Sequence, residues 1–294
     1  MCVIVAKYFP EVGWVAAKNR DRNYIPDLEF KREDSKGLER LLYRDKVTQY
    51  REGLNDEGVC ILSASLMVID DEKEVKEPNK SHSRDGDRIS AALKLPTVSE
   101  AVKYLVKTKL TGNTIVFDKE NMVLIEASNR DGDDGKKEFV FTVKTIPKSE
   151  TLVRTNHGVE LDWAGYQMGN TDNESLSRKS SESRMKLAQK AVDKAKSPQA
   201  ILDLLCKNFV KDPQMNPLRT TTDKKKMRTT AQILMVPSER TMYVRPIQSS
   251  LSFNFWKMDD PDADTWVEIL SNKPLWQDHP RYGNSVSKEL KHKN

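Results

Sequence analysis

The second residue of the chain combines two groups that could carry out nucleophilic catalysis together. Removal of Met1, which the small side chain at position 2 permits, would leave Cys2 with a free α-amino group beside its own thiol. A thiol attacks well only as the thiolate, and because the ordinary pKa of cysteine is about 8.5, a base must take the proton. The α-amino group has an ordinary pKa of about 7.7–8.0, so it is partly neutral near neutral pH and can be that base. Cys2 is therefore a candidate N-terminal nucleophile.

Four further segments follow Cys2 along the chain. They are Lys18-Asn19-Arg20-Asp21, Gly53-Leu54-Asn55-Asp56-Glu57-Gly58-Val59, the run GNTIVFDKENMVLIE at Gly112–Glu126, and Arg154-Thr155-Asn156-His157-Gly158. Each alone is a common pattern. Together, over roughly residues 2–160, they resemble the motifs of the N-terminal-nucleophile (Ntn) enzymes of the choloylglycine hydrolase, penicillin V acylase and acyl-CoA:6-aminopenicillanic acid acyltransferase type. A Ser- and Arg-rich segment at 180–191 and a hairpin at 227–245 extend the resemblance more weakly.

This resemblance implies a role for each matching residue. Cys2 would be the nucleophile, with its own amine as general base and later as acid. Asp21 matches the family aspartate that orients this amine, and Asn156 matches the asparagine whose side-chain N–H helps to form the oxyanion hole. Ser65 stands at the position of the second oxyanion donor, although backbone N–H groups nearby could serve instead. Arg228 matches a late arginine near the nucleophile.

Position 18 departs from the family pattern. Lys18 stands where the choloylglycine-type enzymes carry an arginine near the sulfur. Lysine keeps the charge but lacks the planar fork of donors, so the exchange is not neutral. Arg20 would point to the same face of an extended strand and could supply a guanidinium instead. The sequence leaves the choice between Lys18 and Arg20 open.

The remaining histidine and cysteines are expected to be structural. His157 is not needed as a base if the terminal amine fills that role, so we interpret it as a structural or substrate-adjacent residue. Cys60 lies in an apolar strand pattern and Cys206 in an apolar helical pattern, and both are expected in the core.

The elements that must position these residues are predicted from hydrophobic periodicity and turn residues. We expect strands at 3–9, 14–18, 49–53, 59–66, 113–118, 122–127, 139–146, 229–236 and 241–246, and helices at 89–93, 98–108, 174–196 and 200–209. Ser99 is the expected N-cap of the second helix, and the charged segment 71–88 is expected to be a loop. The order of elements predicts an α+β protein. The family resemblance implies a four-layer αββα sandwich of two antiparallel sheets over residues 1–255, with a partly ordered C-terminal extension at 256–294.

Composition narrows the class of protein further. The chain has 294 residues, 37% of them hydrophobic and 32% charged, with a net charge of +5. It has no apolar run of membrane-spanning length and no secretory signal pattern, and its three cysteines are far apart. We therefore expect a cytoplasmic protein with no membrane, nucleic-acid, metal or cofactor binding. Whether it forms a homo-oligomer is left open.

The expected activity is hydrolysis of a non-peptide linear amide C–N bond in a small acylated substrate. Transfer of the acyl group to an amine is an alternative, since the sequence does not say whether water or an amine reaches the acyl-enzyme. A binding or structural protein with an inactive site on the same fold is a second alternative. A class II glutaminase fits less well, because Val3 stands where that family carries glycine.

Overall fold

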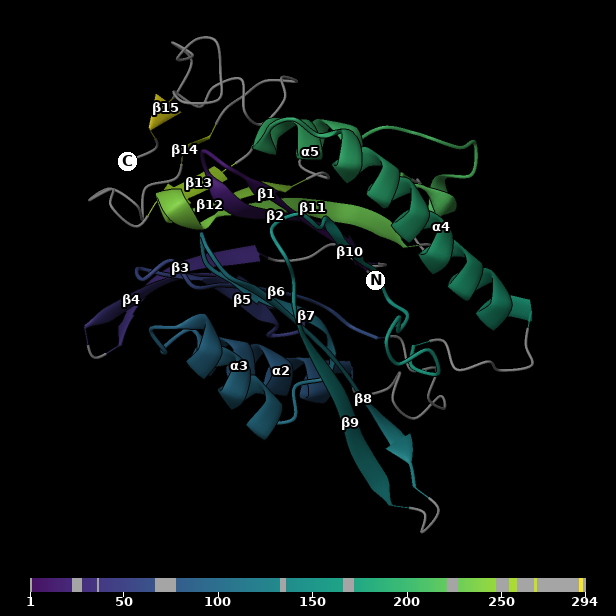
Figure 1. Ribbon diagram of the computed structural model, residues 1–294, viewed down its shortest axis with the longest axis horizontal. Helices are drawn as coiled ribbons and strands as arrows, with labels where there is room; N and C mark the ends of the chain where they lie inside the picture. Colours follow the sequence, from purple (N-terminus) through teal and green to yellow (C-terminus); the bar gives the residue numbers. More distant parts are fainter. Residues whose placement is uncertain are drawn as a thin grey trace.

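Two antiparallel sheets, stacked face to face, form the centre of the structure, and helices cover the outer face of each sheet (Figure 1). The computed structural model describes residues 2–22, 28–35, 37–66, 78–132, 136–165, 172–220, 227–246, 254–257, 267–268 and 291–292. The layer order is helix, sheet, sheet, helix, which confirms the expected α+β sandwich.

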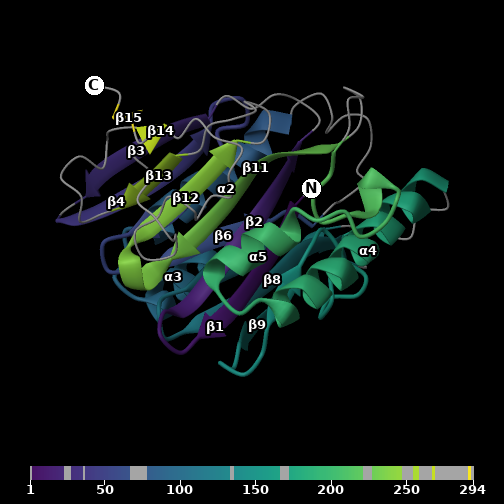
Figure 2. The ribbon, with the colours of Figure 1, turned by 90° about the horizontal axis from the view of Figure 1, so that it is seen from above.

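The first sheet has six strands and carries the amino end of the chain. In spatial order they are β10 (Leu152–Arg154), β1 (Cys2–Phe9), β2 (Gly13–Arg22), β11 (Arg228–Val236), β12 (Thr241–Pro246) and β13 (Asn254–Lys257). Helices α4 (Asp172–Lys194) and α5 (Pro198–Leu205) lie over its outer face (Figure 2). Their apolar faces and the outward residues of β1, β2 and β11 form one buried cluster.

The second sheet has seven strands that follow one another in chain order. They are β3 (Leu28–Ser35), β4 (Leu38–Asp45), β5 (Arg51–Asn55), β6 (Cys60–Ala64), β7 (Gly112–Phe117), β8 (Met122–Asp131) and β9 (Lys137–Thr145). Helices α2 (Pro78–Ala92) and α3 (Val98–Lys107) cover its outer face. A separate two-stranded pair joins β14 (Val267–Glu268) and β15 (Lys291–His292), and two short 3-10 turns occupy Pro213–Met215 and Pro237–Glu239.

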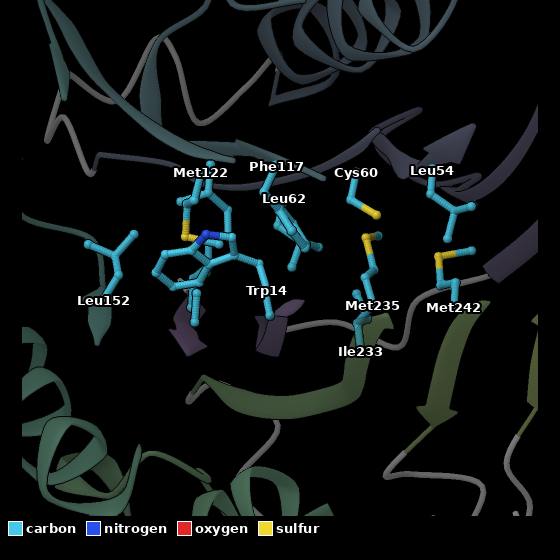
Figure 3. Packing of buried hydrophobic residues seen from close by; sticks show 14 of the residues in the cluster. Trp14, Leu54, Cys60, Leu62, Phe117, Met122, Leu152, Ile233, Met235 and Met242 are labelled. Atoms are coloured by element: carbon cyan, nitrogen blue, oxygen red, sulfur yellow. The ribbon is translucent and has the colours of Figure 1, made fainter. Parts of the chain in front are cut away.

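The core between the sheets is made by alternate residues of facing strands. Trp14 from β2 and Met235 from β11 pack toward Leu62, Phe117 and Met122 of the second sheet (Figure 3). Successive strand residues point to opposite faces, so the other half of β1, β2 and β11 faces α4 and α5. β1, β2 and β11 are therefore buried on both faces.

The turn between β1 and β2 is tied to the second sheet. The backbone N–H of Trp14 donates to the carbonyl of Lys119, 3.0 Å away, in the turn between β7 and β8. Gly13 has a φ of +88°, and a Cβ there would lie 2.3 Å from that carbonyl oxygen. Only glycine satisfies both the left-handed conformation and the close approach. This contact anchors the end of the hairpin farthest from Cys2.

Most predicted hairpins and helices are confirmed, but the segment 71–88 is not a loop throughout. Helix α2 begins at Pro78, so the prediction is wrong from there onward, and residues 71–77 lie outside the described residues. Burial of Ile89 against the second sheet supplies the stabilisation that the polar sequence of α2 does not reveal. The N-cap of α3 is Thr97 rather than Ser99, because the Thr97 hydroxyl accepts a hydrogen bond from the Glu100 N–H.

The predicted domain boundary and the predicted burial of the two other cysteines have different outcomes. Strand β13 crosses the predicted boundary at 255, while most of 256–294 lies outside the described residues, so the extension stays a prediction. Cys206 is not a core residue: it caps the C-terminus of α5, is partly exposed, and its thiol donates to Gln232 Oε1 at 3.2 Å. Cys60 is buried as expected, and burial raises the pKa of its thiol well above the ordinary value.

Candidate active site

Cys2 is the first residue of β1, at the end of the first sheet, and only 3% of its surface is exposed. It pairs with Arg20 on β2, and its side chain joins the cluster between the sheets. Its backbone nitrogen donates to Asn156 Oδ1 at 2.8 Å. Arg22 Nη1 lies 3.7 Å from the Cys2 sulfur, within hydrogen-bond range for sulfur. The Cys2 thiol, the nitrogen of the same residue and a cation thus meet in one place.

The pKa of the Cys2 thiol is lowered from its ordinary value to about 7. Burial is the largest influence and by itself raises this pKa. The positive charges of Lys18 and, to a smaller extent, Arg22 are among the influences that outweigh burial, although Asp21 opposes them. A substantial fraction of the sulfur is therefore thiolate at neutral pH, as a cysteine nucleophile requires.

Lys18 acts on the sulfur through space, because its ammonium group is bound to other groups. Its Nζ donates to both carboxylate oxygens of Glu52 at 2.7 Å and to the carbonyl of Ser63 at 2.6 Å. Both members of the ion pair are fully buried. Glu52 also accepts hydrogen bonds from the hydroxyls of Tyr43 and Tyr50. Burial raises the pKa of both tyrosines well above the ordinary value, so the phenols remain neutral donors.

Arg20, the alternative to Lys18 in the sequence analysis, is directed elsewhere. Its guanidinium forms a fully buried ion pair with Asp45 and a hydrogen bond to the Thr230 hydroxyl. It also lies over the ring of Tyr43. Of the two candidates, Lys18 is the one whose charge lowers the pKa of Cys2.

Asp21 faces the helix layer rather than the space between the sheets. Its carboxylate accepts hydrogen bonds from Arg184 on α4 and from the Thr229 hydroxyl, both at 2.8 Å, and lies 3.7 Å from Arg219 Nη1. Arg184 also donates to Asn156 Oδ1 at 3.1 Å, the same atom that accepts from the Cys2 nitrogen. Asp21 is thus connected to the Cys2 nitrogen through Arg184 and Asn156.

The structure brings Asn156 and Ser65 together. Asn156 Nδ2 donates to the carbonyl oxygen of Ser65 at 2.7 Å. The side-chain N–H expected in the oxyanion hole therefore lies beside the strand end where the second donor was predicted. Here Ser65 acts as an acceptor, so its role as a donor stays a prediction.

Arg228 begins β11 and lies directly opposite Arg22 across the β2–β11 ladder. It is partly buried, and its Nε is a buried atom without a hydrogen-bond partner among the described residues. Its predicted place near the nucleophile is consistent with this register, because Arg22 contacts the Cys2 sulfur.

Two motif residues of the second sheet hold the loop that carries Asn156. Asn113 on β7 donates to the carbonyl oxygens of Thr155 and His157, both at 3.1 Å. Glu126 on β8 accepts from the backbone nitrogens of Val159 and Leu161 at 2.9 and 2.6 Å. The Gly112–Glu126 segment therefore positions Asn156 from across the sandwich. The sequence analysis gave the residues of this segment no individual role.

His157 also supports this loop through its ring. Its Nδ1 lies 2.8 Å from the Ser181 hydroxyl, which accepts a hydrogen bond from the backbone N–H of Asn156. Burial lowers the pKa of His157 to about 4, so the imidazole is neutral at neutral pH. The structural interpretation of His157 made from the sequence agrees with these contacts.

Sequence reasoning missed Arg22, Arg184 and Glu52. Arg22 could have been found, because it continues the alternation of Lys18 and Arg20 on the same strand face. Arg184 lies in the Ser- and Arg-rich segment, but its partner Asp21 is 163 positions away. Nothing local in the sequence marks Glu52 as the partner of Lys18.

Within the described part of the chain, no group of three or more His, Cys, Asp or Glu side chains could hold a metal ion. None of the described helices has the length and apolar character needed to cross a bilayer.

Comparisons with known proteins found solved structures only. No family model and no curated protein matches the chain. Penicillin V acylase from Agrobacterium tumefaciens is similar to it, with 13% identity and a TM-score of 0.49 over 100% of this chain and 98% of the other. The mutant C2A conjugated bile acid hydrolase from Clostridium perfringens has 13% identity and a TM-score of 0.47 over 90% of this chain and 94% of the other. At this identity the likeness concerns the layered fold, which the strand pairing establishes by itself.

Proposed function

We propose that this protein hydrolyses a non-peptide linear amide through Cys2 as an N-terminal nucleophile. The observation that carries the proposal is the environment of Cys2: a thiol with a pKa of about 7 at the start of a strand, with its own nitrogen bonded to Asn156 Oδ1. A buried cysteine without such surroundings would have a raised pKa, as Cys60 does. The contrast between these two buried thiols supports a chemical role for Cys2.

The proposed reaction begins after removal of Met1, when the nitrogen of Cys2 becomes an amine. The amine takes the thiol proton, and the thiolate attacks the amide carbonyl carbon to form a C–S bond. In this proposal Asn156 Nδ2, which also donates to the Ser65 carbonyl, donates a hydrogen bond to the oxyanion that develops. The protonated amine then donates its proton to the leaving nitrogen as the C–N bond breaks. Water attacks the thioester in the same way and releases the acid and the thiol.

Acyl transfer is the second candidate function. It shares every step up to the acyl-enzyme and differs only in the acceptor, an amine instead of water. Measuring how the acyl group divides between free acid and an added amine distinguishes the two. An inactive binding protein on the same fold is less well supported, because it would not need a Cys2 pKa near 7.

The substrate class follows from the proposed chemistry as small acylated amides. We propose testing penicillin V, conjugated bile acids, N-acyl amino acids and acyl-homoserine lactones, which place a carbonyl next to different leaving groups. A reducing cytoplasm as the place of reaction stays a prediction, as does any homo-oligomer.

Replacement of Cys2 tests the nucleophile. Cys2→Ala should lower turnover at least about a thousandfold, because the covalent intermediate cannot form. Iodoacetamide at pH 7 should label residue 2 in the unmodified protein, while the raised pKa of Cys60 protects that residue. Cys206→Ala is the matched control and should keep full turnover, since its thiol contacts Gln232 away from Cys2. Unchanged turnover in Cys2→Ala would end the proposal.

Intact-mass measurement tests the amine as base. The purified active protein should lack Met1, and a variant with an uncleavable extension before Cys2 should be inactive, because its nitrogen would be an amide without basicity. An active protein that retains Met1 would contradict this mechanism even if Cys2 proved essential.

A further inference from the structure

Position 18 lacks a free donor for the sulfur. An ammonium group has three N–H donors. In Lys18 they face the two oxygens of Glu52 and the carbonyl of Ser63, at 2.6–2.7 Å. The charge of Lys18 is also balanced by a carboxylate in direct contact. Lys18 therefore contributes a positive potential at the sulfur but no hydrogen bond.

Arg22 has the geometry that Lys18 lacks. It follows Lys18 by four residues and Arg20 by two on β2, so the three side chains leave the strand on the same face. Its Nη1 lies 2.7 Å from the carbonyl oxygen of Asp21 and 3.7 Å from the Cys2 sulfur. One terminal nitrogen of a guanidinium carries two N–H groups, so the first bond fixes the orientation in which the second points toward the sulfur.

We infer that Arg22 is a catalytic residue of this protein, donating a hydrogen bond to the Cys2 thiolate in place of the residue at position 18. The inference rests on the proposed function of Cys2 as a nucleophile. A guanidinium bound to the thiolate stabilises the attacking form and loses that attraction when the sulfur becomes a neutral thioester. It also regains the contact as the thiolate leaves during deacylation, so the same residue serves both halves of the reaction.

Other ionisable groups act on the sulfur or lie near it, and they must be held constant in any test. On β2 these are Lys18 and Asp21. Tyr43 reaches from the second sheet, and Arg228 lies across the ladder from Arg22 on β11. A change at Arg22 alone leaves all of these in place.

The test measures the thiolate without any substrate. The rate of iodoacetamide alkylation at residue 2 is followed by peptide mass spectrometry between pH 5 and 9 in Arg22→Gln, Arg22→Met and Arg22→Lys. In Arg22→Gln and Arg22→Met the midpoint of the pH profile of the alkylation rate should rise by about one pH unit, and the alkylation rate at pH 6 should fall about tenfold. Arg22→Lys restores the charge without the fork and should give an intermediate midpoint.

The matched control is Arg130→Gln, an exposed arginine on the β8–β9 hairpin that pairs with Glu138. Its alkylation midpoint should equal that of the unmodified protein. Circular dichroism establishes that each variant is folded, and Arg22 is only partly buried at a strand end, which favours folding of all three. An unchanged midpoint in either folded neutral variant overturns the role of Arg22. The proposed function would still stand in that case if Cys2→Ala abolished turnover.

Discussion

Around Cys2, single side chains have separate tasks that their types alone do not reveal. Lys18 and Arg20 share a strand face, yet one is bound to Glu52 and the other to Asp45. Each buried cation therefore has its own buried carboxylate, as isolated charges in a low-dielectric interior would be costly. What remains for the sulfur is the potential of Lys18 and the direct contact of Arg22.

At the same scale, His157 makes stability depend on pH. Its pKa is about 4 in the folded protein and about 6.5 when unfolded, so between these values the unfolded chain binds the proton first. Stability is complete above about pH 6.5 and falls as pH decreases toward 4. Between pH 7 and pH 5 the free energy of unfolding should decrease by about 1 kcal/mol less in His157→Asn than in the unmodified protein, after allowance for solvent screening. Urea unfolding at both pH values measures this difference.

Asp85 also makes stability depend on pH in this range, and its contribution must be separated from that of His157. Burial raises its pKa to about 6, so its contribution to stability increases as pH falls through that value, opposite to the effect of His157. Because Asp85 is unchanged in both proteins, its contribution cancels in the difference. Equal pH dependence in the two proteins would show that His157 is not held neutral.

At the scale of elements, helix α4 is attached to the first sheet in two ways. Its alanines and Val192 pack on the outward face of β1, and their small size allows a close approach. Arg184 passes through this layer fully buried and bonds Asp21 and Asn156 on two different segments. The helix thereby fixes the acceptor of the Cys2 nitrogen as well as covering the sheet.

Arg184→Met tests this second role. Loss of the guanidinium leaves the buried Asp21 carboxylate with Thr229 and a longer contact to Arg219, so we expect the free energy of unfolding to fall by about 3 kcal/mol. Arg178→Met, in the same helix, removes a surface pair with Glu182 and should cost less than about 0.5 kcal/mol. Chemical unfolding of both variants measures the contrast, and equal losses would show that the buried network adds nothing.

At the scale of the whole molecule, the site depends on how the two sheets are stacked. Cys2 and Asn156 belong to the first sheet and its adjoining loop, while Glu52, Ser65 and Asn113 come from the second. The inter-sheet core therefore sets the distances within the site (Figure 3).

Trp14→Ala tests the stacking. Trp14 is fully buried between the sheets, and its removal should cost about 3–5 kcal/mol through lost transfer energy and a residual cavity. Phe141→Ala is the control, since 44% of that side chain is exposed on β9, and it should change stability by less than about 0.5 kcal/mol. Denaturant unfolding, analysed with the same dependence of the free energy of unfolding on denaturant concentration for both variants, measures both values. A loss below 1 kcal/mol for Trp14→Ala would contradict this account of the core.

Features that depend on near neighbours in the chain could be predicted from the amino-acid order alone. Alternation along β2 placed Lys18 and Arg20 on one face, Ser197-Pro198 began α5, and Asn55–Gly58 formed the turn between β5 and β6. Strand and turn conformations are local, so periodicity and turn residues suffice to predict them. Strand β3 escaped prediction because its charged residues are stabilised by pairs with β4 across the ladder, such as Arg32 with Glu39.

The pairing of buried charges, in contrast, depends on how the layers pack in the folded protein. Asp21 and Arg184 are 163 positions apart, and Lys18 and Glu52 are 34 apart on different sheets. Such partners are chosen by the stacking of layers, in which burial makes an unpaired charge too costly to keep. For the same reason the sequence predicted a cation near Cys2 but did not single out Arg22, whose contact with the sulfur depends on where β1 begins beside β2.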